Sequence, residues 1–481
     1  MTTPRGPIVF NNGVTGSDTA ASGLGPATAV TGTAAAHTGG VASTTITLTN
    51  SPDLSGLTAG DMLFLATSST TRRFSVISAW DNTAKTVTVD DSFTIASGSA
   101  VNYAIGGKRQ TLDHADSRRL GTDLKGYVTI EIEYTGTNYT LTSTQWIVSA
   151  STGGNSVAVV RIKGTGGRPV IEQQANIACF SGHISGFGRL TLENLWLINT
   201  AGTKTLAFGM GWGDGTTLTA INCVFGSLTT GSRLWSAYMR TSGSEQPLIT
   251  LIDCAIINAA GPAACGYNVN HYLQMSGCFI RGGASYGIAH GDPAQSLYVQ
   301  DSIITGCANH GIAVWGAYET VIRRCTIHGC GGSGIVLNVA NSPANGPTWG
   351  LIIESCNITD NSGYGVLAKT DQDKVKGLVD YNNFGHAASG TANSSGPYSN
   401  ITMGDHDLTV DPQYADADNF DFSVGPNVTN KGYLAALTAI GADQSNTIHY
   451  QDIGAARHSE PTPDEIAEGA WVDYLNRTLT S

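Results

Sequence analysis

The stretch from Leu273 to Ala368 repeats one sequence pattern four times, and this pattern decides the fold. It reads LQMSGCFIRGGASYGIAH at 273–290, LYVQDSIITGCANHGIAV at 297–314, TVIRRCTIHGCGGSGIVL at 320–337 and LIIESCNITDNSGYGVLA at 351–368. In each copy, two short runs of alternating apolar residues flank a two-residue bend. Because side chains alternate between the two faces of a strand, each copy predicts two strands with one buried face.

Four positions of each copy are predicted to point inward. They are Leu273, Met275, Cys278 and Ile280; Leu297, Val299, Ser302 and Ile304; Thr320, Ile322, Cys325 and Ile327; and Leu351, Ile353, Cys356 and Ile358. The third of these positions recurs along a longer stretch at intervals of 23 to 31 residues, as Leu195, Cys223, Cys254, Cys278, Ser302, Cys325, Cys356 and Asn382.

A repeat of this length, with alternating strands, glycine or asparagine bends and no helical pattern, is typical of a parallel β-helix. Each coil of such a solenoid buries its inner face by stacking on its neighbours. Leucine-rich repeats have a similar period, but these units contain neither a helix nor a consistent LxxLxLxxN frame. The sequence therefore predicts an all-β protein built on a parallel β-helix.

Composition agrees with this fold and excludes some partners. The 481 residues include 60 glycines and 13% charged residues, against about 25% in typical domains. The net charge of -12 and the lack of a basic cluster argue against a nucleic-acid partner. The sequence contains neither a run of about 18 apolar residues nor the apolar core of a signal peptide at its start. We therefore expect synthesis in a cytoplasm and no membrane insertion.

Nine cysteines raise the question of disulfides or metal. Five occupy the third inward position, and Cys307 and Cys330 share another repeated position. This recurrence favours a ladder of reduced, buried thiols over disulfides. Since no CxxC or histidine cluster accompanies the thiols, we predict no metal site. Phosphate-loop, nucleophile-elbow and HExxH motifs are also absent from the sequence, and we predict no cofactor.

The chain order suggests six segments. Residues 1–43, rich in Gly, Ala, Ser and Thr, are expected to be an arm that orders only on a partner. Residues 44–107 contain five strand-like runs and predict a small antiparallel barrel or sandwich. Residues 108–126 predict a linker with a short capping helix over 111–120. The β-helix then extends over 127–400, a closing module over 401–460 and a C-terminal helix over 461–481.

The closing module carries a resemblance to a known family. It contains Asp411, Pro412, Tyr414 and Asp416, then Asp421-Phe422, then Asp452-Ile453-Gly454-Ala455. This order resembles the end of many right-handed parallel β-helix proteins of the pectate-lyase-like type, although their GSPAID element is replaced here by Gly425-Pro426-Asn427 and Lys431-Gly432. Together with Gly106-Gly107-Lys108-Arg109 and the final PTPDEIAEGAWVDYLNRTLTS, it looks like virion structural proteins of tailed bacteriophages. The resemblance implies a right-handed, single-stranded β-helix and location in a virion.

The last 21 residues predict a docking helix. Thr462 and Glu465 form a capping box, and Pro463 suits the first helical position. Apolar residues then recur at helical spacing, including Ile466, Trp471, Tyr474 and Leu475. A helix this short is marginal alone, so we expect a partner to bury this stripe. A sister subunit and another virion protein are the candidates, and packing on this chain's own last coil is the alternative.

Polysaccharide cleavage would require paired carboxylates for a glycoside hydrolase, or clustered aspartates with Ca²⁺ and a basic residue for a polysaccharide lyase. Glu354 and Asp380 share one outward position on adjacent coils, one coil after Arg323, and Asp371 and Asp373 lie in the loop between them. Carboxylates about 5 Å apart suit retaining glycoside hydrolysis. A surface ion pair between Arg323 and Glu354 explains the same residues without chemistry.

Aromatic residues lie in or near the longer loops, where insertions in solenoids form the working face. They are Trp212, Trp235, Tyr238, Trp315, Tyr318 and Trp349. Such rings stack on sugars or pack against a neighbouring subunit, and simple loop packing is the alternative.

These observations leave three functional classes open. The first is a non-enzymatic virion protein, a tail spike, tail fibre or capsid decoration, that displays a β-helix for attachment or particle stabilisation. The second is a tailspike glycanase that cleaves host surface polysaccharide, and the third is a bacterial adhesin. The sparsely charged outer faces, together with the resemblance, suggest a homotrimer. Other virion proteins, held through the N-terminal arm and the C-terminal helix, and host glycan are the expected partners.

Overall fold

A computed structural model describes most of the chain up to Phe422. The described residues are 5–13, 15–18, 20–35, 41–66, 72–95, 101–112, 127–142, 145–149, 159–175, 179–183, 189–200, 209–211, 217–227, 248–258, 272–282, 286–290, 296–314, 319–337, 348–369, 375–385, 393–401, 404–419 and 422. Their regular elements are strands and one 3-10 turn, η4 (Ala417–Asn419), so no described helix could cross a membrane. The chain divides into two compact units. The first contains residues 1–227, 233–256 and 268–274, and the second contains the remaining residues.

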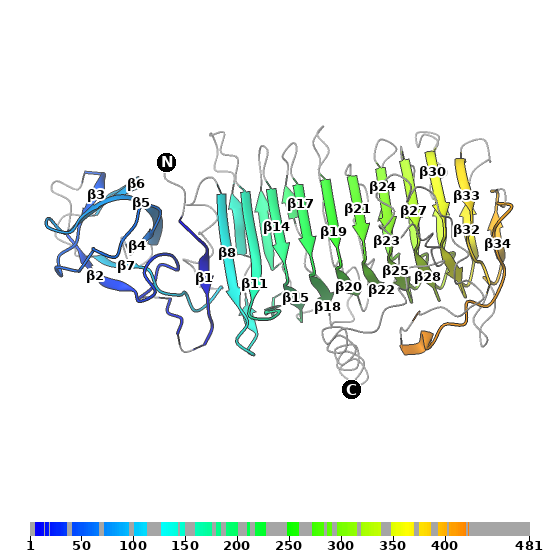
Figure 1. Ribbon diagram of the computed structural model, residues 1–481, viewed down its shortest axis with the longest axis horizontal. Helices are drawn as coiled ribbons and strands as arrows, with labels where there is room; N and C mark the ends of the chain where they lie inside the picture. Colours follow the sequence, from blue (N-terminus) through cyan, green and yellow to red (C-terminus); the bar gives the residue numbers. More distant parts are fainter. Residues whose placement is uncertain are drawn as a thin grey trace, which may run out of the picture. The chain divides into compact units, whose positions relative to one another are not determined.

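The first unit contains the predicted antiparallel domain, which is a six-stranded barrel (Figure 1). Its strands are β2 (Val30–Ala34), β3 (Ser43–Thr47), β4 (Met62–Ala66), β5 (Arg72–Asp81), β6 (Thr86–Phe93) and β7 (Val101–Ile105). They pair in the order β2-β7-β4-β5-β6-β3. A bridge between Ala34 and Leu48 and a 2.8 Å bond from the Ala35 amide to the Thr47 carbonyl close the ring. Closure leaves no edge strand for aggregation.

Part of the segment expected to be an anchor or arm lies within the described residues. β1 (Ile8–Phe10) pairs in parallel with β8 (Tyr127–Glu133), and both Ile8 and Phe10 are buried. β2 is the sixth barrel strand, paired with β7. These residues therefore add strands to cores that later residues provide.

The junction after the barrel centres on one buried charge. Arg109 is fully buried, with its guanidinium 5.2 Å from the ring centroids of both Phe64 and Phe74. It donates a 3.0 Å hydrogen bond to the Ala21 carbonyl and lies 3.9 Å from the Asp18 carboxylate. Such contacts offset the cost of burying a cation. Residues 113–126, with most of the predicted capping helix, lie outside the described part.

The remaining strands of the first unit form three parallel sheets, one strand per coil (Figure 1). The first sheet continues from β8 through β11 (Val159–Thr165), β14 (Arg189–Glu193), β17 (Thr217–Ile221) and β19 (Leu248–Ile252). The second contains β9 (Tyr139–Leu141), β12 (Val170–Gln173), β15 (Trp196–Asn199) and β18 (Val224–Ser227), and the third contains β10 (Gln145–Ser149), β13 (Phe180–His183) and β16 (Gly209–Gly211).

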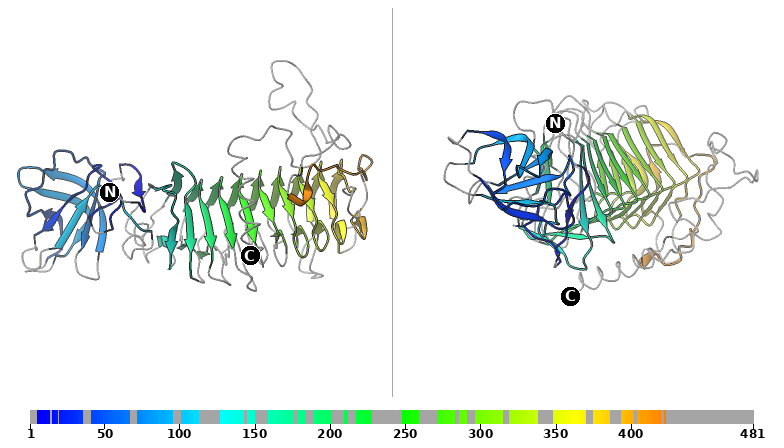
Figure 2. Two further views of the ribbon diagram at one scale, coloured as in Figure 1. Left: turned by 90° about the horizontal axis from the view of Figure 1, so that it is seen from below. Right: turned by 60° about the vertical axis from the view of Figure 1, so that its left-hand side comes forward.

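The second unit repeats this arrangement (Figure 2). Its first sheet contains β24 (Ser296–Gln300), β27 (Glu319–Arg323), β30 (Thr348–Glu354) and β33 (Val375–Asp380). Its second contains β22 (Phe279–Arg281), β25 (Ile303–Thr305), β28 (Thr326–His328) and β31 (Asn357–Thr359). Its third contains β23 (Ile288–His290), β26 (Ile312–Val314), β29 (Ile335–Leu337), β32 (Tyr364–Ala368) and β34 (Gly396–Ser399). Each of β20 (Ala255–Asn258) and β21 (Tyr272–Ser276) belongs partly to the first unit and partly to the second.

Burial confirms the predicted register of the parallel β-helix. All sixteen inward candidates between Leu273 and Ile358 are at most 2% exposed. The eight described cysteines are buried and form no disulfide, namely Cys179, Cys223, Cys254, Cys278, Cys307, Cys325, Cys330 and Cys356. The thiol ladder is therefore part of the core.

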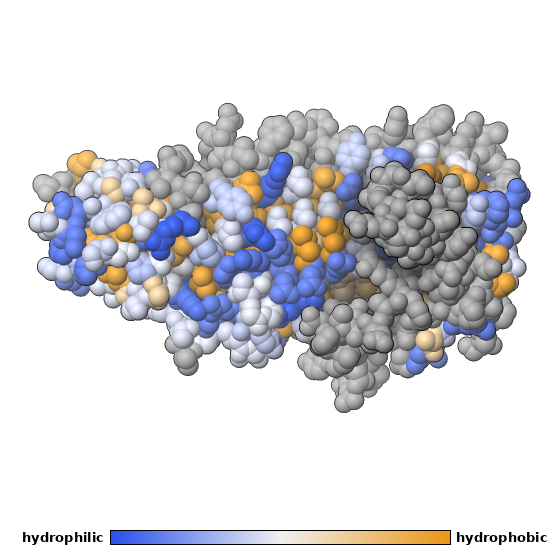
Figure 3. Space-filling view, viewed as in Figure 1, coloured by the Kyte–Doolittle hydropathy of each residue, from blue (hydrophilic) through white to orange (hydrophobic). Residues whose placement is uncertain are grey.

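The outer face of the first sheet changes character along the first unit. In the early coils it carries ion pairs between Glu131 and Lys163 and between Arg161 and Glu193. In the same outward register, β17 and β19 instead present the half-buried Ile221 and Ile252. Figure 3 shows apolar side chains gathered over these two strands.

Candidate functional site

Three charged residues stand in one outward row on the first sheet of the second unit. Arg323, Glu354 and Asp380 each end their strand, β27, β30 and β33. In the parallel register Arg323 pairs with Glu354, and Glu354 pairs with Asp380. Neighbouring strands lie about 4.8 Å apart, so the sheet brings the two carboxylates together at adjacent positions.

Glu354 is largely withdrawn from solvent. It is 6% exposed, and its Oε1 lies 2.5 Å from Nε of Arg323. Burial raises the pKa of Glu354, and the charges of Arg323 and Arg324 offset part of this rise. Its other oxygen, Oε2, is buried and accepts no hydrogen bond from any residue that the structure describes. Arg324 itself holds Asp301 through two hydrogen bonds of 2.6 and 2.7 Å.

Asp380 is fully engaged by neighbouring donors. Its Oδ1 accepts 2.8 Å hydrogen bonds from the backbone amides of Tyr381 and His406, and its Oδ2 lies 2.9 Å from Nδ1 of His406. Burial alone would raise the pKa of Asp380, but these hydrogen bonds outweigh it and hold the pKa below its ordinary value. Asp380 is therefore an ionised carboxylate that holds the backbone and the ring of His406 in place.

A pair of stacked rings lies beside Asp380. The rings of Tyr381 and His406 are 4.3 Å apart between centroids and 5° from parallel. The hydrogen bond to Asp380 raises the pKa of His406 above its ordinary value. The His406 side chain is 56% exposed, whereas Tyr381 is half-buried.

Tyr381 occupies a corner position with a special backbone conformation. At the bend between the first two sheets, a residue with positive φ recurs from coil to coil. The non-glycine ones have φ between 49° and 60°, namely Asn194, Asn222, Asp253, Asp301, Arg324, Ser355 and Tyr381, and Gly277 has φ 65°. Asparagine and aspartate tolerate this left-handed region best, and a bulky residue there is an outlier.

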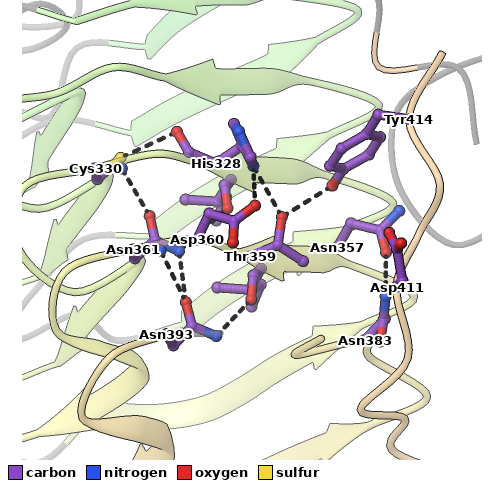
Figure 4. Close-up of polar contacts among 12 residues, drawn as sticks. His328, Cys330, Asn357, Thr359, Asp360, Asn361, Asn383, Asn393, Asp411 and Tyr414 are labelled. Atoms are coloured by element: carbon purple, nitrogen blue, oxygen red, sulfur yellow. Dashed lines mark hydrogen bonds and ion pairs between the residues drawn. The ribbon is translucent and has the colours of Figure 1, made fainter. Parts of the chain in front are cut away.

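The closing module lies against the second sheet of the same unit (Figure 4). Tyr414 and Phe422 contact His328 edge to face, at centroid distances of 5.4 and 5.2 Å. Thr359 Oγ1 lies 3.1 Å from the Tyr414 hydroxyl and 3.0 Å from Nδ1 of His328. Burial lowers the pKa of His328, and the nearby Asp360 partly opposes this shift. Two residues of the family motif, Tyr414 and Phe422, thus pack against the outer face of the coils.

Several predicted site residues lie outside the described part of the chain. These are Trp212, Trp235, Tyr238, Trp315, Tyr318, Asp371 and Asp373, together with Ile466, Trp471, Tyr474 and Leu475 of the predicted docking helix. Trp349 belongs to β30, but its side chain is likewise outside the description. Within the described ranges, no group of three or more His, Cys, Asp and Glu side chains is placed to hold a metal ion.

Sequence reasoning missed Tyr381 and His406. The tyrosine directly follows Asp380 at the corner position, and a bulky residue in that aligned column was a usable signal. No comparable signal existed for His406, because its place beside Asp380 depends on the path of the chain after the last coil.

Comparison with known proteins agrees with the fold. A family model described as a right-handed beta helix region matches residues 211–377. None of the curated proteins compared with this chain matches it.

Similar solved structures include the A-module of mannuronan C-5 epimerase AlgE6 from Azotobacter vinelandii, at 15% identity and a TM-score of 0.27, over 58% of this chain and 91% of that one. The tailspike gp49 of Pseudomonas phage LKA1 matches at 14% identity and a TM-score of 0.22, over 81% and 62%. The catalytic domain of a GH87 α-1,3-glucanase matches at 12% identity and a TM-score of 0.25, over 79% and 88%. At these values the likeness carries no argument about activity.

Proposed function

We propose that this chain is a non-enzymatic structural protein of a phage virion, a tail spike, tail fibre or capsid decoration. Its β-helix would be a rigid surface for attachment to host glycan or for stabilising the particle. The observation that carries the non-enzymatic part is the state of the paired carboxylates. Asp380 is held by three hydrogen bonds, and Glu354 is buried against Arg323.

A retaining glycosidase needs one carboxylate free to attack the sugar and one acid that reaches the glycosidic oxygen. Attack by Asp380 would require its contacts with His406 and the Tyr381 amide to break. Proton donation by Glu354 would require a side chain that is 6% exposed to reach the substrate past its ion pair. The row therefore suits a structural charge network better than an acid and nucleophile pair.

The virion location rests on the resemblance of the closing module, of Gly106-Gly107-Lys108-Arg109 and of the last 21 residues to virion proteins. Mass spectrometry of purified particles, from a phage whose genome encodes this chain, tests it directly. We expect the full-length chain at a stoichiometry of several copies per particle. Its absence from particles, with presence in the infected-cell lysate, would overturn the proposal.

A glycanase is the second candidate, and one observation favours it. The pKa of Glu354 is raised while that of its register partner Asp380 is lowered, and acid-base pairs in enzymes show this same separation. In that case Glu354 would be the proton donor and Asp380 the ionised partner. Cleavage of host polysaccharide that disappears in Glu354→Gln would establish this alternative.

A further inference from the structure

We propose that Tyr381 and His406 form a stacking platform for a neutral hexose unit of a glycan. This inference rests on the proposed attachment function and assigns its binding site to the last described coils. The two rings are 4.3 Å apart and nearly parallel, and the outermost one, His406, is 56% exposed. A flat ring presented to solvent is the feature that packs against the C–H face of a sugar.

The orientation of the His406 ring is already fixed by contacts within the protein. The Asp380 carboxylate holds Nδ1 of His406 at 2.9 Å and also accepts its backbone amide at 2.8 Å. Tyr381 covers one face of the imidazole. Because ring rotation is already restricted on both sides, binding would cost little further side-chain entropy.

The backbone at Tyr381 is unfavourable for a tyrosine. Its φ is 60°, in a column where earlier coils carry Asn194, Asn222 and Asp253. The left-handed conformation penalises a bulky side chain, and such strain gathers at binding and active sites. Tyr381 is half-buried, and its ring stacks on that of His406.

Polar groups for sugar hydroxyls lie in the adjoining coils. Glu354, one strand from Asp380, is buried and holds Arg323 in place by an ion pair. Arg323, one strand further, is 36% exposed at its side chain. Coils about 4.8 Å apart place these groups along one line beside the ring pair.

The surrounding charge selects the class of sugar. Asp380, Asp405 and Asp407 all act on His406 electrostatically and raise its pKa, whereas burial raises the pKa of Asp407 to about 6. Above that pH the three carboxylates outnumber the single imidazolium, and the net negative charge would repel a uronate or another acidic sugar. Carboxylates and an arginine instead suit hydroxyl groups, so the site fits a neutral hexose.

Binding of neutral hexose oligosaccharides to the full-length protein tests the proposal. The probes are gluco-, galacto- and manno-hexaoses, with an oligouronate as the acidic comparison, and the readouts are saturation-transfer NMR and titration calorimetry. Tyr381→Asn removes the ring and places a residue favoured at this φ, so its melting temperature should not fall. His406→Ala removes the other ring. Tyr127→Ala, at a 49% exposed tyrosine of the first unit, is the matched control.

We expect at least one neutral hexaose to bind, with an affinity reduced at least tenfold in Tyr381→Asn and in His406→Ala and unchanged in Tyr127→Ala. Equal affinity in all variants would overturn the site. Binding of the oligouronate alone, or of no probe, would overturn the sugar class. Attachment of labelled protein to host cells, measured in parallel, separates the two proposals: attachment that persists in both ring variants leaves the virion function intact and removes the platform.

Discussion

At the inward bend position, three side chains accept a hydrogen bond from the backbone of the coil before them. Ser302 Oγ accepts from the Cys278 amide at 3.1 Å, and Asn382 Oδ1 accepts from the Cys356 amide at 3.0 Å. The thiol of Cys356 lies 3.5 Å from the Cys325 amide in the same relation. Buried amides need an acceptor, so Ser, Cys and Asn at these three positions have a role that alanine could not take over.

Ser302→Ala should expose this requirement. The substitution leaves the buried Cys278 amide without its acceptor, which should lower the free energy of unfolding by about 1–3 kcal/mol. Ser302→Cys is the control, because it restores the thiol found in neighbouring coils and should cost less than about 1 kcal/mol. Urea denaturation followed by circular dichroism measures both. Equal stabilities of the two variants would contradict the acceptor role.

His406 should titrate above an ordinary histidine. Its hydrogen bond to Asp380 raises its pKa, so the stabilising interaction is fully present below the ordinary value of 6.5 and is lost as pH rises through the raised pKa. An NMR titration of the imidazole protons should report this value, and Asp380→Asn should lower it. An unchanged pKa in that variant would show that another group causes the shift.

Among the elements, the closing segment depends on two aromatic contacts. Phe422 is 2% exposed and meets the rings of His328 and Tyr414 at 5.2 and 5.1 Å. Phe422→Ala should cost about 3–5 kcal/mol, release the segment from β28 and β31, and raise the pKa of His328 towards 6.5.

Hydrogen exchange of the amides in these two strands, with NMR of His328, checks this outcome. Tyr414→Phe is the matched control, since it keeps the ring and removes only the hydroxyl near Thr359. Protection of both strands that stays unchanged in Phe422→Ala would show that the segment is held by other contacts.

The elements also show what sequence could and could not predict. Strand register followed directly from alternation, because a one-residue slip would turn Leu351 and Ile353 outward. The row of Arg323, Glu354 and Asp380 followed from the same spacing. The position of His406 beside Asp380 could not follow, because it is set by a turn after the last coil that has no repeat to align with.

At the scale of the whole chain, the N-terminal segment shows what composition does not measure. Residues 8–10 and 30–34 are short, yet they complete a coil sheet and a barrel whose other strands come from later residues. Local composition measures whether a segment can form its own core, whereas a single added strand needs only a matching edge.

Removal of residues 461–481 tests the predicted docking helix and the expected homotrimer. We expect the truncated chain to keep its circular dichroism spectrum and melting temperature while losing trimerisation or incorporation into particles, because the apolar stripe is predicted to contact a partner. Sedimentation analysis of both proteins supplies the measurement. A truncated protein that misfolds would make the segment a cap of the solenoid.

The most direct test of the non-enzymatic account is the chain length of host envelope glycan during incubation with the purified protein. Size-exclusion chromatography and reducing-end analysis should show an unchanged length distribution over time, with the glycan retained on immobilised protein. Depolymerisation by the wild-type protein that is lost in Glu354→Gln would contradict the account and identify the charged row as an active site.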